Sequence, residues 1–221
     1  SLSCFLIFFV CALGSFFVIF KNPRKEINIV WSLFSLSVAL WAIGFYFTFS
    51  AITESQAYFW SKLHNYFAFF IPAFFIHFVF SFLEKKSKFW VPFSYGCFSL
   101  LLLAALIKPK LFLNGVYSPY PFNYYDSGGP LFGVFFVLYT FFSCLGVYYL
   151  VQALKVLKGK RFQQLLYILV GVSIGFVSGG STFPMVFSMP ILPYSLPLIS
   201  LYVFLVIFAI TKHDLMDLQV V

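Results

Sequence analysis

The chain has 221 residues, of which 62% are hydrophobic and only 9% are charged. Soluble globular domains are roughly 45–50% apolar and about 25% charged, so this composition cannot supply a water-soluble surface. It also excludes a disordered chain, which depends on low hydrophobicity and high net charge. The net charge of +8 does not indicate nucleic acid as a partner, because the basic residues are scattered between apolar runs. The lipid bilayer is therefore the expected surroundings of the protein.

Apolar runs long enough to cross a bilayer, about 20 residues each, follow one another along the chain. The first five lie at 2–20, 27–51, 58–83, 89–107 and 131–154. The stretch 162–211 carries no formal charge, and as a single helix it would be about 75 Å long, so it must fold back. Glycines and prolines between 179 and 193 predict a sixth helix at about 162–182 and a seventh at about 194–211.

The sequence therefore predicts an all-α integral membrane bundle of seven transmembrane helices. Transmembrane strands are excluded, because the runs lack the alternation of apolar and polar residues that such strands require. The seven-helix domain is expected to span 1–211, and 212–221 is expected to begin a cytoplasmic linker to an output domain outside this chain. Both ends of the sequence suggest one domain of a longer protein.

The distribution of lysine and arginine predicts the orientation, because cytoplasmic connections carry an excess of these residues. Eleven of the 14 basic residues follow the first, third, fifth and seventh helices. The remaining three are Lys62, Lys108 and Lys110. We therefore expect the N-terminus outside and the C-terminus in the cytoplasm.

No pair of nucleophile and base, no phosphate-binding glycine loop and no metal-ligand cluster appears at a usable spacing. The four cysteines lie inside apolar runs without the paired spacing of a metal site. The sequence thus predicts no catalytic residue, no metal and no cofactor in this chain.

Polar groups at membrane depth are the candidate functional residues, because burying them in lipid is costly. His77 lies well inside the third predicted helix, either as a hydrogen-bonded bundle residue or as a group that titrates near neutral pH. Pro72, one turn earlier, predicts a kink at which the helix can hinge. Lys62, His64 and Asn65 cluster near the outer end of the same helix. Either Lys62 extends to the outer lipid headgroups, or the cluster forms the polar floor of an external pocket.

Two further features complete the candidate set. Gly171, Gly175 and Gly179 form a stripe of small residues on the sixth helix, for packing inside the bundle or for a dimer contact. The longest connection, 108–130, is rich in aromatic residues and forms either a lid over a cavity or an interfacial anchor. Its candidate ligand-sensing residues, with Trp41 of the second helix, are Tyr117, Tyr120, Tyr124 and Tyr125.

Several motifs follow one another in a fixed order along nearly the whole chain. They are Asn28 with Trp31, Phe34, Ala39 and Trp41; Phe59-Trp60 with Leu63; Phe70-Ile71-Pro72 with His77-Phe78; Gly129-Pro130-Leu131-Phe132 with Tyr139; and the final run from Ala209 to Leu218. Their order and spacing resemble the N-terminal seven-helix sensory region of bacterial and archaeal membrane histidine kinases. In this family the bundle is a sensor that drives a cytoplasmic output.

The resemblance implies the sensory input domain of a two-component sensor in the cell inner membrane, acting as a homodimer through the full-length protein. Its stimulus would be an unknown small or lipophilic molecule, bound between the aromatic connection and helices two, three and six. The chain itself would not be an enzyme, although the full-length protein would be an ATP-dependent protein-histidine kinase or carry another output such as a diguanylate cyclase. His213 lacks the context of a phosphorylated histidine.

Two other classes remain open from the sequence. A small transporter or channel would place ionisable or unwound segments at the midplane, often in repeated halves. Here His77 is the exception in a nearly charge-free midplane, and no internal repeat is evident. A purely structural membrane anchor is the other alternative.

Overall fold

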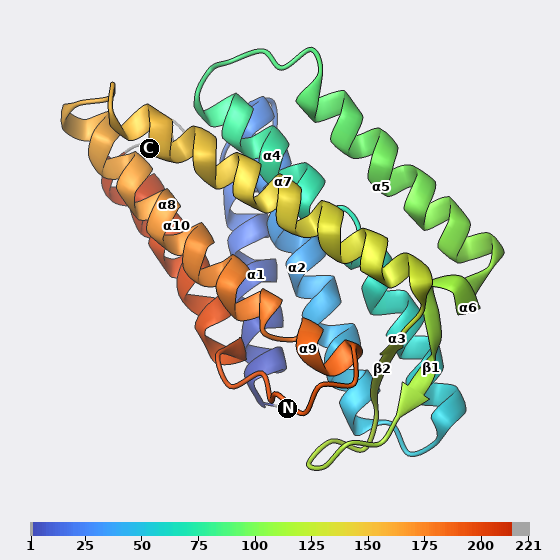
Figure 1. Ribbon diagram of the computed structural model, residues 1–221. Coiled ribbons are helices and arrows are strands. Elements are labelled where there is room, and N and C mark those ends of the chain that lie inside the picture. The colour runs from blue at the N-terminus through green and yellow to red at the C-terminus, as the bar shows by residue number, and fades with distance from the viewer. Residues whose placement is uncertain (1, 214–221) are drawn as a thin grey trace.

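The computed structural model describes residues 2–213 as a bundle of long helices with a small hairpin at one end (Figure 1). The elements in chain order are α1 (Leu2–Lys21), α2 (Glu26–Ser50), α3 (Glu54–Ala68), α4 (Ile71–Phe82), α5 (Trp90–Ile107), α6 (Pro109–Phe112), β1 (Leu113–Tyr117), β2 (Tyr125–Gly128), α7 (Pro130–Leu154), α8 (Gly159–Gly180), α9 (Phe183–Val186), the 3-10 turn η1 (Leu196–Leu198) and α10 (Ile199–His213). Within these residues, six helical stretches are long and apolar enough to cross a membrane, and 196–209 is a shorter apolar helix.

The helices pack as neighbours in an order that partly departs from the chain order. α2 contacts α1, α3 and α4, and α4 also contacts α5 and α7. The last helix, α10, lies beside the first helix, α1, and also packs along α8. In Figure 1, α5 lies at one edge, and the N-terminus lies at the same end of the bundle as the hairpin.

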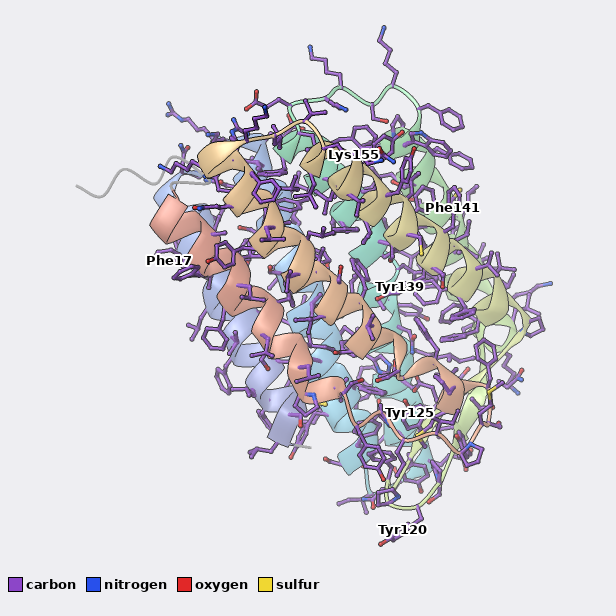
Figure 2. The ribbon with its side chains drawn as sticks, turned by 60° about the vertical axis from the view of Figure 1, so that its left-hand side comes forward. Phe17, Tyr120, Tyr125, Tyr139, Phe141 and Lys155 are labelled. Carbon is purple, nitrogen blue, oxygen red and sulfur yellow. The ribbon has the colours of Figure 1, made fainter. Side chains whose placement is uncertain are left out.

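The outward faces of the helices are apolar. Phe17 and Phe141 point away from the bundle in Figure 2 and are 40% and 43% exposed. Leu100 on α5 and Val177 on α8 are 69% and 73% exposed. Such a continuous apolar exterior would be unstable in water, so it is a surface for lipid.

The third predicted helix is interrupted, as Pro72 predicted. α3 ends at Ala68, and α4 begins at Ile71 with Pro72 in its first turn. Proline has no N–H, so Pro72 cannot donate the hydrogen bond that a continuous helix would make to the carbonyl of Ala68. Residues Phe69 and Phe70 form the resulting turn. Hinge motion at this turn stays a prediction.

The fold-back between the sixth and seventh predicted helices is confirmed. α8 ends at Gly180, and the short α9, an irregular segment with Pro190 and Pro193, and η1 lead into α10. The glycine stripe of α8 faces α10, and a Cβ added at Gly171 would lie 3.3 Å from the carbonyl oxygen of Tyr202. The stripe therefore serves packing inside the bundle and is not a free face for a second copy.

The connection 108–130 contains an antiparallel hairpin that the sequence did not predict. β1 pairs with β2, with Val116 opposite Asp126 and Tyr117 opposite Tyr125. Its tip carries Tyr120, which is 96% exposed (Figure 2). The hairpin lies against α3 and α9, so it closes one end of the bundle.

Candidate functional site: a cavity closed by the hairpin

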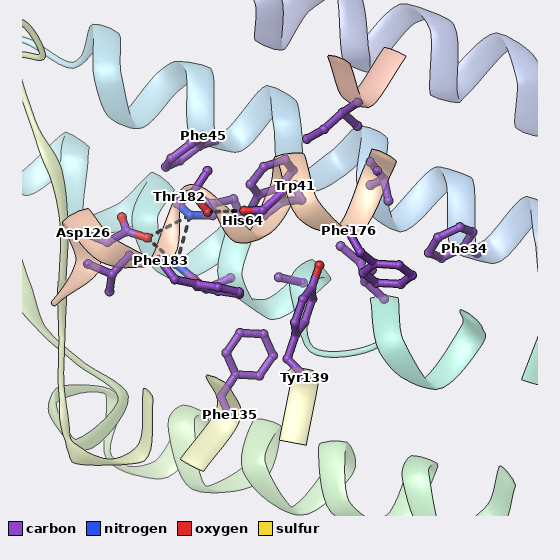
Figure 3. Close-up of a pocket in the computed structure, with 18 of the residues that line it drawn as sticks. Phe34, Trp41, Phe45, His64, Asp126, Phe135, Tyr139, Phe176, Thr182 and Phe183 are labelled. Carbon is purple, nitrogen blue, oxygen red and sulfur yellow. Dashed lines mark hydrogen bonds and ion pairs between the residues drawn. The ribbon is translucent and has the colours of Figure 1, made fainter. Parts of the chain in front are cut away.

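A cavity lies inside the bundle near the hairpin end and is walled by segments from across the chain (Figure 3). Its free volume, the space open to the centre of a water-sized sphere, is about 60 Å³. Side chains from α2, α3, α4, β2, α7, α8, α9 and α10 contribute to its wall. A single water molecule needs roughly 10–15 Å³ of such space, so the cavity is several times larger than a water site.

Aromatic rings form a large part of the wall. Phe34 of α2 lies 5.7 Å from Tyr202 of α10, measured between ring centroids, and 6.2 Å from Phe176 of α8. Tyr139 of α7 lies 5.1 Å from Phe183 of α9. These rings come from five helices, namely α2, α7, α8, α9 and α10. A change in what occupies the cavity therefore acts on several helices at once.

A polar cluster occupies the end of the cavity nearest the hairpin. Asp126 of β2 is 2% exposed, and its carboxylate contacts three side chains of α3. Ser61 Oγ donates to Oδ1 at 2.5 Å, and Asn65 Nδ2 donates to Oδ2 at 2.7 Å. His64 Nε2 lies 3.0 Å from Oδ2. The cluster is therefore a cross-link between the hairpin and α3.

Both ring nitrogens of His64 have partners. Its Nδ1 lies 3.1 Å from the carbonyl oxygen of Trp60. Its Nε2 lies 3.0 Å from the Asp126 carboxylate and 3.0 Å from Asn65 Nδ2. The imidazole is thus held in one orientation by contacts at both nitrogens.

Helix geometry explains why these groups gather. Ser61, His64, Asn65 and Ala68 recur at intervals of three and four residues, so they share one face of α3. α2 approaches that face closely, because Gly44 has no side chain and a Cβ there would lie 2.6 Å from the Cβ of His64. The imidazole is thus fixed between α2 and the hairpin.

Two tyrosines fasten the hairpin to the segment after α8. The Tyr125 hydroxyl donates to the carbonyl oxygen of Thr182 at 2.8 Å, and the Tyr117 hydroxyl donates to that of Met185 at 2.6 Å. Burial, and secondly the charge of Asp126, raise the pKa of both phenols, that of Tyr125 well above its usual range. Both hydroxyls therefore remain protonated donors.

Tyr139 places one more polar group in the wall. Its hydroxyl points into the cavity in Figure 3. A Cβ added at Gly179 would lie 3.6 Å from this oxygen. Within residues 2–213 the Tyr139 hydroxyl has no hydrogen-bond partner, so it is available to a bound molecule.

The structure brings some of the predicted site residues together and separates others. Those that line the cavity are Trp41, His64, Asn65, Gly175 and Gly179. Tyr125 and Tyr117 lie in the hairpin beside the cavity, whereas Tyr124 is half-buried and Tyr120 points away from the bundle. Pro72 and Gly171 are absent from the lining, although Ile71 and Val172 beside them belong to it.

Lys62 and His77 lie elsewhere. The Lys62 ammonium sits 4.7 Å above the ring of Tyr58 on the same helix and does not line the cavity. His77 Nε2 lies 2.9 Å from Glu26 Oε1, and its Nδ1 lies 3.0 Å from the Tyr95 hydroxyl oxygen. Because Glu26 begins α2 and Gly44 lies far along it, His77 belongs to the opposite end of the bundle from His64.

Sequence analysis missed Asp126, Ser61, Thr182 and Tyr139 as cavity-associated residues. Asp126 carried a usable signal, because it is one of only six acidic residues in the chain and lies in the aromatic connection. No comparable signal marked the others. Within residues 2–213, no group of three or more His, Cys, Asp and Glu side chains is placed to hold a metal ion.

An apolar exterior, membrane-length helices and an internal cavity with a buried polar cluster define a multi-pass helical membrane protein. A sequence model of the N-terminal 7TM region of histidine kinases matches residues 3–219, which is nearly the whole chain. The chain therefore belongs to this family. No curated protein and no solved structure matches it.

Proposed function

We propose that the chain is the membrane-embedded sensory input domain of a sensor histidine kinase, and that a stimulus bound in the cavity is relayed through α10, the seventh span. The observation that carries this proposal is the double role of α10. Ile199 and Tyr202 line the cavity, and the helix then continues to His213, roughly 16 Å farther along its axis. A ligand that favours one packing of α10 would shift the end of the helix that leads toward an output domain.

We further propose seven spans with the N-terminus outside and the C-terminus in the cytoplasm, in the cell inner membrane. The lysine-rich connections after α4 and α7 lie at the opposite end of the bundle from the N-terminus and the hairpin (Figures 1 and 2). Lys155 marks that end in Figure 2. The bias of basic residues toward cytoplasmic connections supports this orientation. The linker proposed at 212–221 lies mostly outside the described residues.

A homodimer of the full-length protein, in which the two output domains meet, completes the proposal. We also propose that the full-length protein is an ATP-dependent protein-histidine kinase.

A reporter enzyme that is active only on the outer side of the membrane, fused after residue 120, would test the orientation. We expect that fusion to be active. If only a fusion after residue 157 is active, the orientation is the reverse of the one proposed.

The relay is tested with two aromatic positions on α10 in the full-length protein. Tyr202 faces the cavity and donates to Ser35 Oγ at 3.3 Å, whereas Phe204 is 56% exposed on the outward face. Tyr202→Ala should change the autophosphorylation rate in membrane vesicles several-fold, because a bias of about 1.4 kcal/mol moves a two-state equilibrium tenfold. Phe204→Ala, the control, should leave the rate unchanged.

The possible results separate the classes. If the folded Tyr202→Ala protein phosphorylates itself at the wild-type rate, cavity contacts of α10 do not control the output. A structural anchor makes that same prediction. If instead Phe204→Ala has the larger effect, the outward face of α10 transmits the signal, and the cavity-based relay is wrong.

A further inference from the structure

The charge balance of the cavity restricts what it can bind. Of its lining residues, all within the described part of the chain, only His64 and Asp126 carry an imidazole or a carboxylate, and they face each other at 3.0 Å. Both are already engaged, because Ser61 and Asn65 donate to the carboxylate and the imidazole also contacts Trp60. A ligand with a net charge would therefore enter without a free counter-charge, which is strongly unfavourable in a low-dielectric site.

The wall also restricts the shape of the ligand. Trp41, Phe135, Phe176 and Phe183 present ring faces and edges to the same space (Figure 3). Flat rings pack efficiently against such surfaces in offset or edge-to-face arrangements. A planar aromatic molecule fits this wall better than a branched or strongly hydrated one.

The polar groups are placed at separate points of this apolar space. The Tyr139 hydroxyl points inward without a partner in residues 2–213, while His64 lies across the cavity beside Asp126 (Figure 3). Asn65 donates a hydrogen bond to the same carboxylate. A phenol hydroxyl both donates and accepts, so Tyr139 can pair with a hydroxyl or a carbonyl group. Such a group on the ligand would be recognised by a buried hydrogen bond, which discriminates strongly against an analogue that lacks it.

We propose that the cavity binds a neutral, membrane-soluble aromatic molecule that carries a hydroxyl or carbonyl oxygen, with that oxygen hydrogen-bonded to Tyr139. This inference deepens the proposed function, because it names the ligand class of the cavity through which α10 would be controlled. The ring lies among Phe135, Phe176 and Phe183, and the paired side chains of His64 and Asp126 close the far end.

Three naphthalene compounds test this class with the full-length protein in lipid nanodiscs. They are 2-naphthol, which is neutral and carries one hydroxyl; naphthalene, which lacks it; and 2-naphthoate, which is an anion. Binding is measured as the rise of the thermal unfolding midpoint with the concentration of each compound in the lipid phase. We expect 2-naphthol to bind at least several-fold more tightly than naphthalene, and 2-naphthoate to bind most weakly.

Two glycines at the end of α8 supply a matched pair of variants. A Cβ at Gly179 projects toward Tyr139, whereas a Cβ at Gly180 meets no atom within 4 Å. Gly179→Leu should therefore abolish the effect of 2-naphthol, and Gly180→Leu should retain it. Tyr139→Phe keeps the ring but removes the hydroxyl. It should therefore weaken the binding of 2-naphthol about three- to tenfold and leave the binding of naphthalene unchanged. Tyr139→Phe carries the test if Gly179→Leu fails to fold.

The proposal is overturned if naphthalene binds as tightly as 2-naphthol and Tyr139→Phe changes neither, which would indicate an unselective apolar space such as one for an acyl chain. Tighter binding of 2-naphthoate would overturn the neutrality argument. An unchanged response of folded Gly179→Leu would place binding outside the cavity. A different result would contradict the proposed function alone. In that case 2-naphthol binds as expected, but Tyr202→Ala leaves autophosphorylation unchanged.

Discussion

Replacing Asp126 with alanine tests whether the buried cluster holds the hairpin on the bundle. The carboxylate accepts from Ser61, His64 and Asn65, and all four side chains are less than 5% exposed. Asp126→Ala leaves three buried donors without their acceptor. Each unsatisfied buried donor costs about 1–3 kcal/mol, and loss of one partner from a buried ion pair costs about 3–5 kcal/mol.

These two figures overlap, because the His64 donor is counted in both. The adjoining cavity also offers space for water to hydrogen-bond to the donors that lose Asp126, which reduces the loss of stability. We therefore expect Asp126→Ala to lower the free energy of unfolding by about 3 kcal/mol. Asp126→Asn keeps the shape and one acceptor oxygen, so its effect should be smaller, about 1–2 kcal/mol.

The measurement is equilibrium unfolding of the purified protein in mixed detergent micelles, with helical circular dichroism as the readout. Asn123→Ala is the control in the same hairpin, because Asn123 is exposed and its amide makes only a 3.4 Å hydrogen bond to the carbonyl of Ala51. It should change stability by less than about 0.5 kcal/mol. A loss below about 1 kcal/mol for Asp126→Ala would refute the description of this cluster as a buried cross-link.

Four further changes probe other parts of the structure. Gly44→Ala should destabilise by about 1–3 kcal/mol in the same unfolding assay, because its Cβ would overlap His64, whereas Gly96→Ala has open space and should be neutral or slightly stabilising. Tyr125→Phe should lower hydrogen-exchange protection of the hairpin by about 1 kcal/mol, since only the bond to Thr182 is lost. Tyr120→Ala should leave 2-naphthol binding unchanged, and reduced binding would contradict the position of this exposed ring. His77→Gln should change stability by less than about 0.5 kcal/mol, because its Glu26 partner is 71% exposed; a larger loss would show that this contact is shielded.

The long helices were predictable because lipid imposes a simple rule on sequence. A run of about 20 apolar residues must satisfy its backbone hydrogen bonds internally, so length and hydropathy suffice to locate it. Proline and glycine chemistry located the interruption before Pro72 and the fold-back after Gly180. These features depend on local properties of the chain.

The site was only partly predictable, because its geometry depends on contacts between distant residues. His64 and Asn65 were selected for their polarity, yet their partner Asp126 lies more than sixty residues away in a hairpin with no strong turn signal. His77 has the same polarity as His64 but lies near Glu26 at the other end of the bundle. Hydropathy measures the cost of burying a polar group but carries no information on which neighbour compensates that cost.

The break at Phe69 and Phe70 divides one membrane crossing into two parts that share α2 as a neighbour but differ in their other partners. α3 packs against the hairpin and carries Ser61, His64 and Asn65, while α4 packs against α7 and carries His77. Under the proposed function, recognition and scaffold are thereby modular within a single span. We expect chimeras of related domains joined between 69 and 70, with a matching hairpin, to exchange ligand preference while keeping the opposite half of the bundle. Under the proposed function, such a boundary lets substitutions that alter the stimulus accumulate without disturbing the helices that support the output.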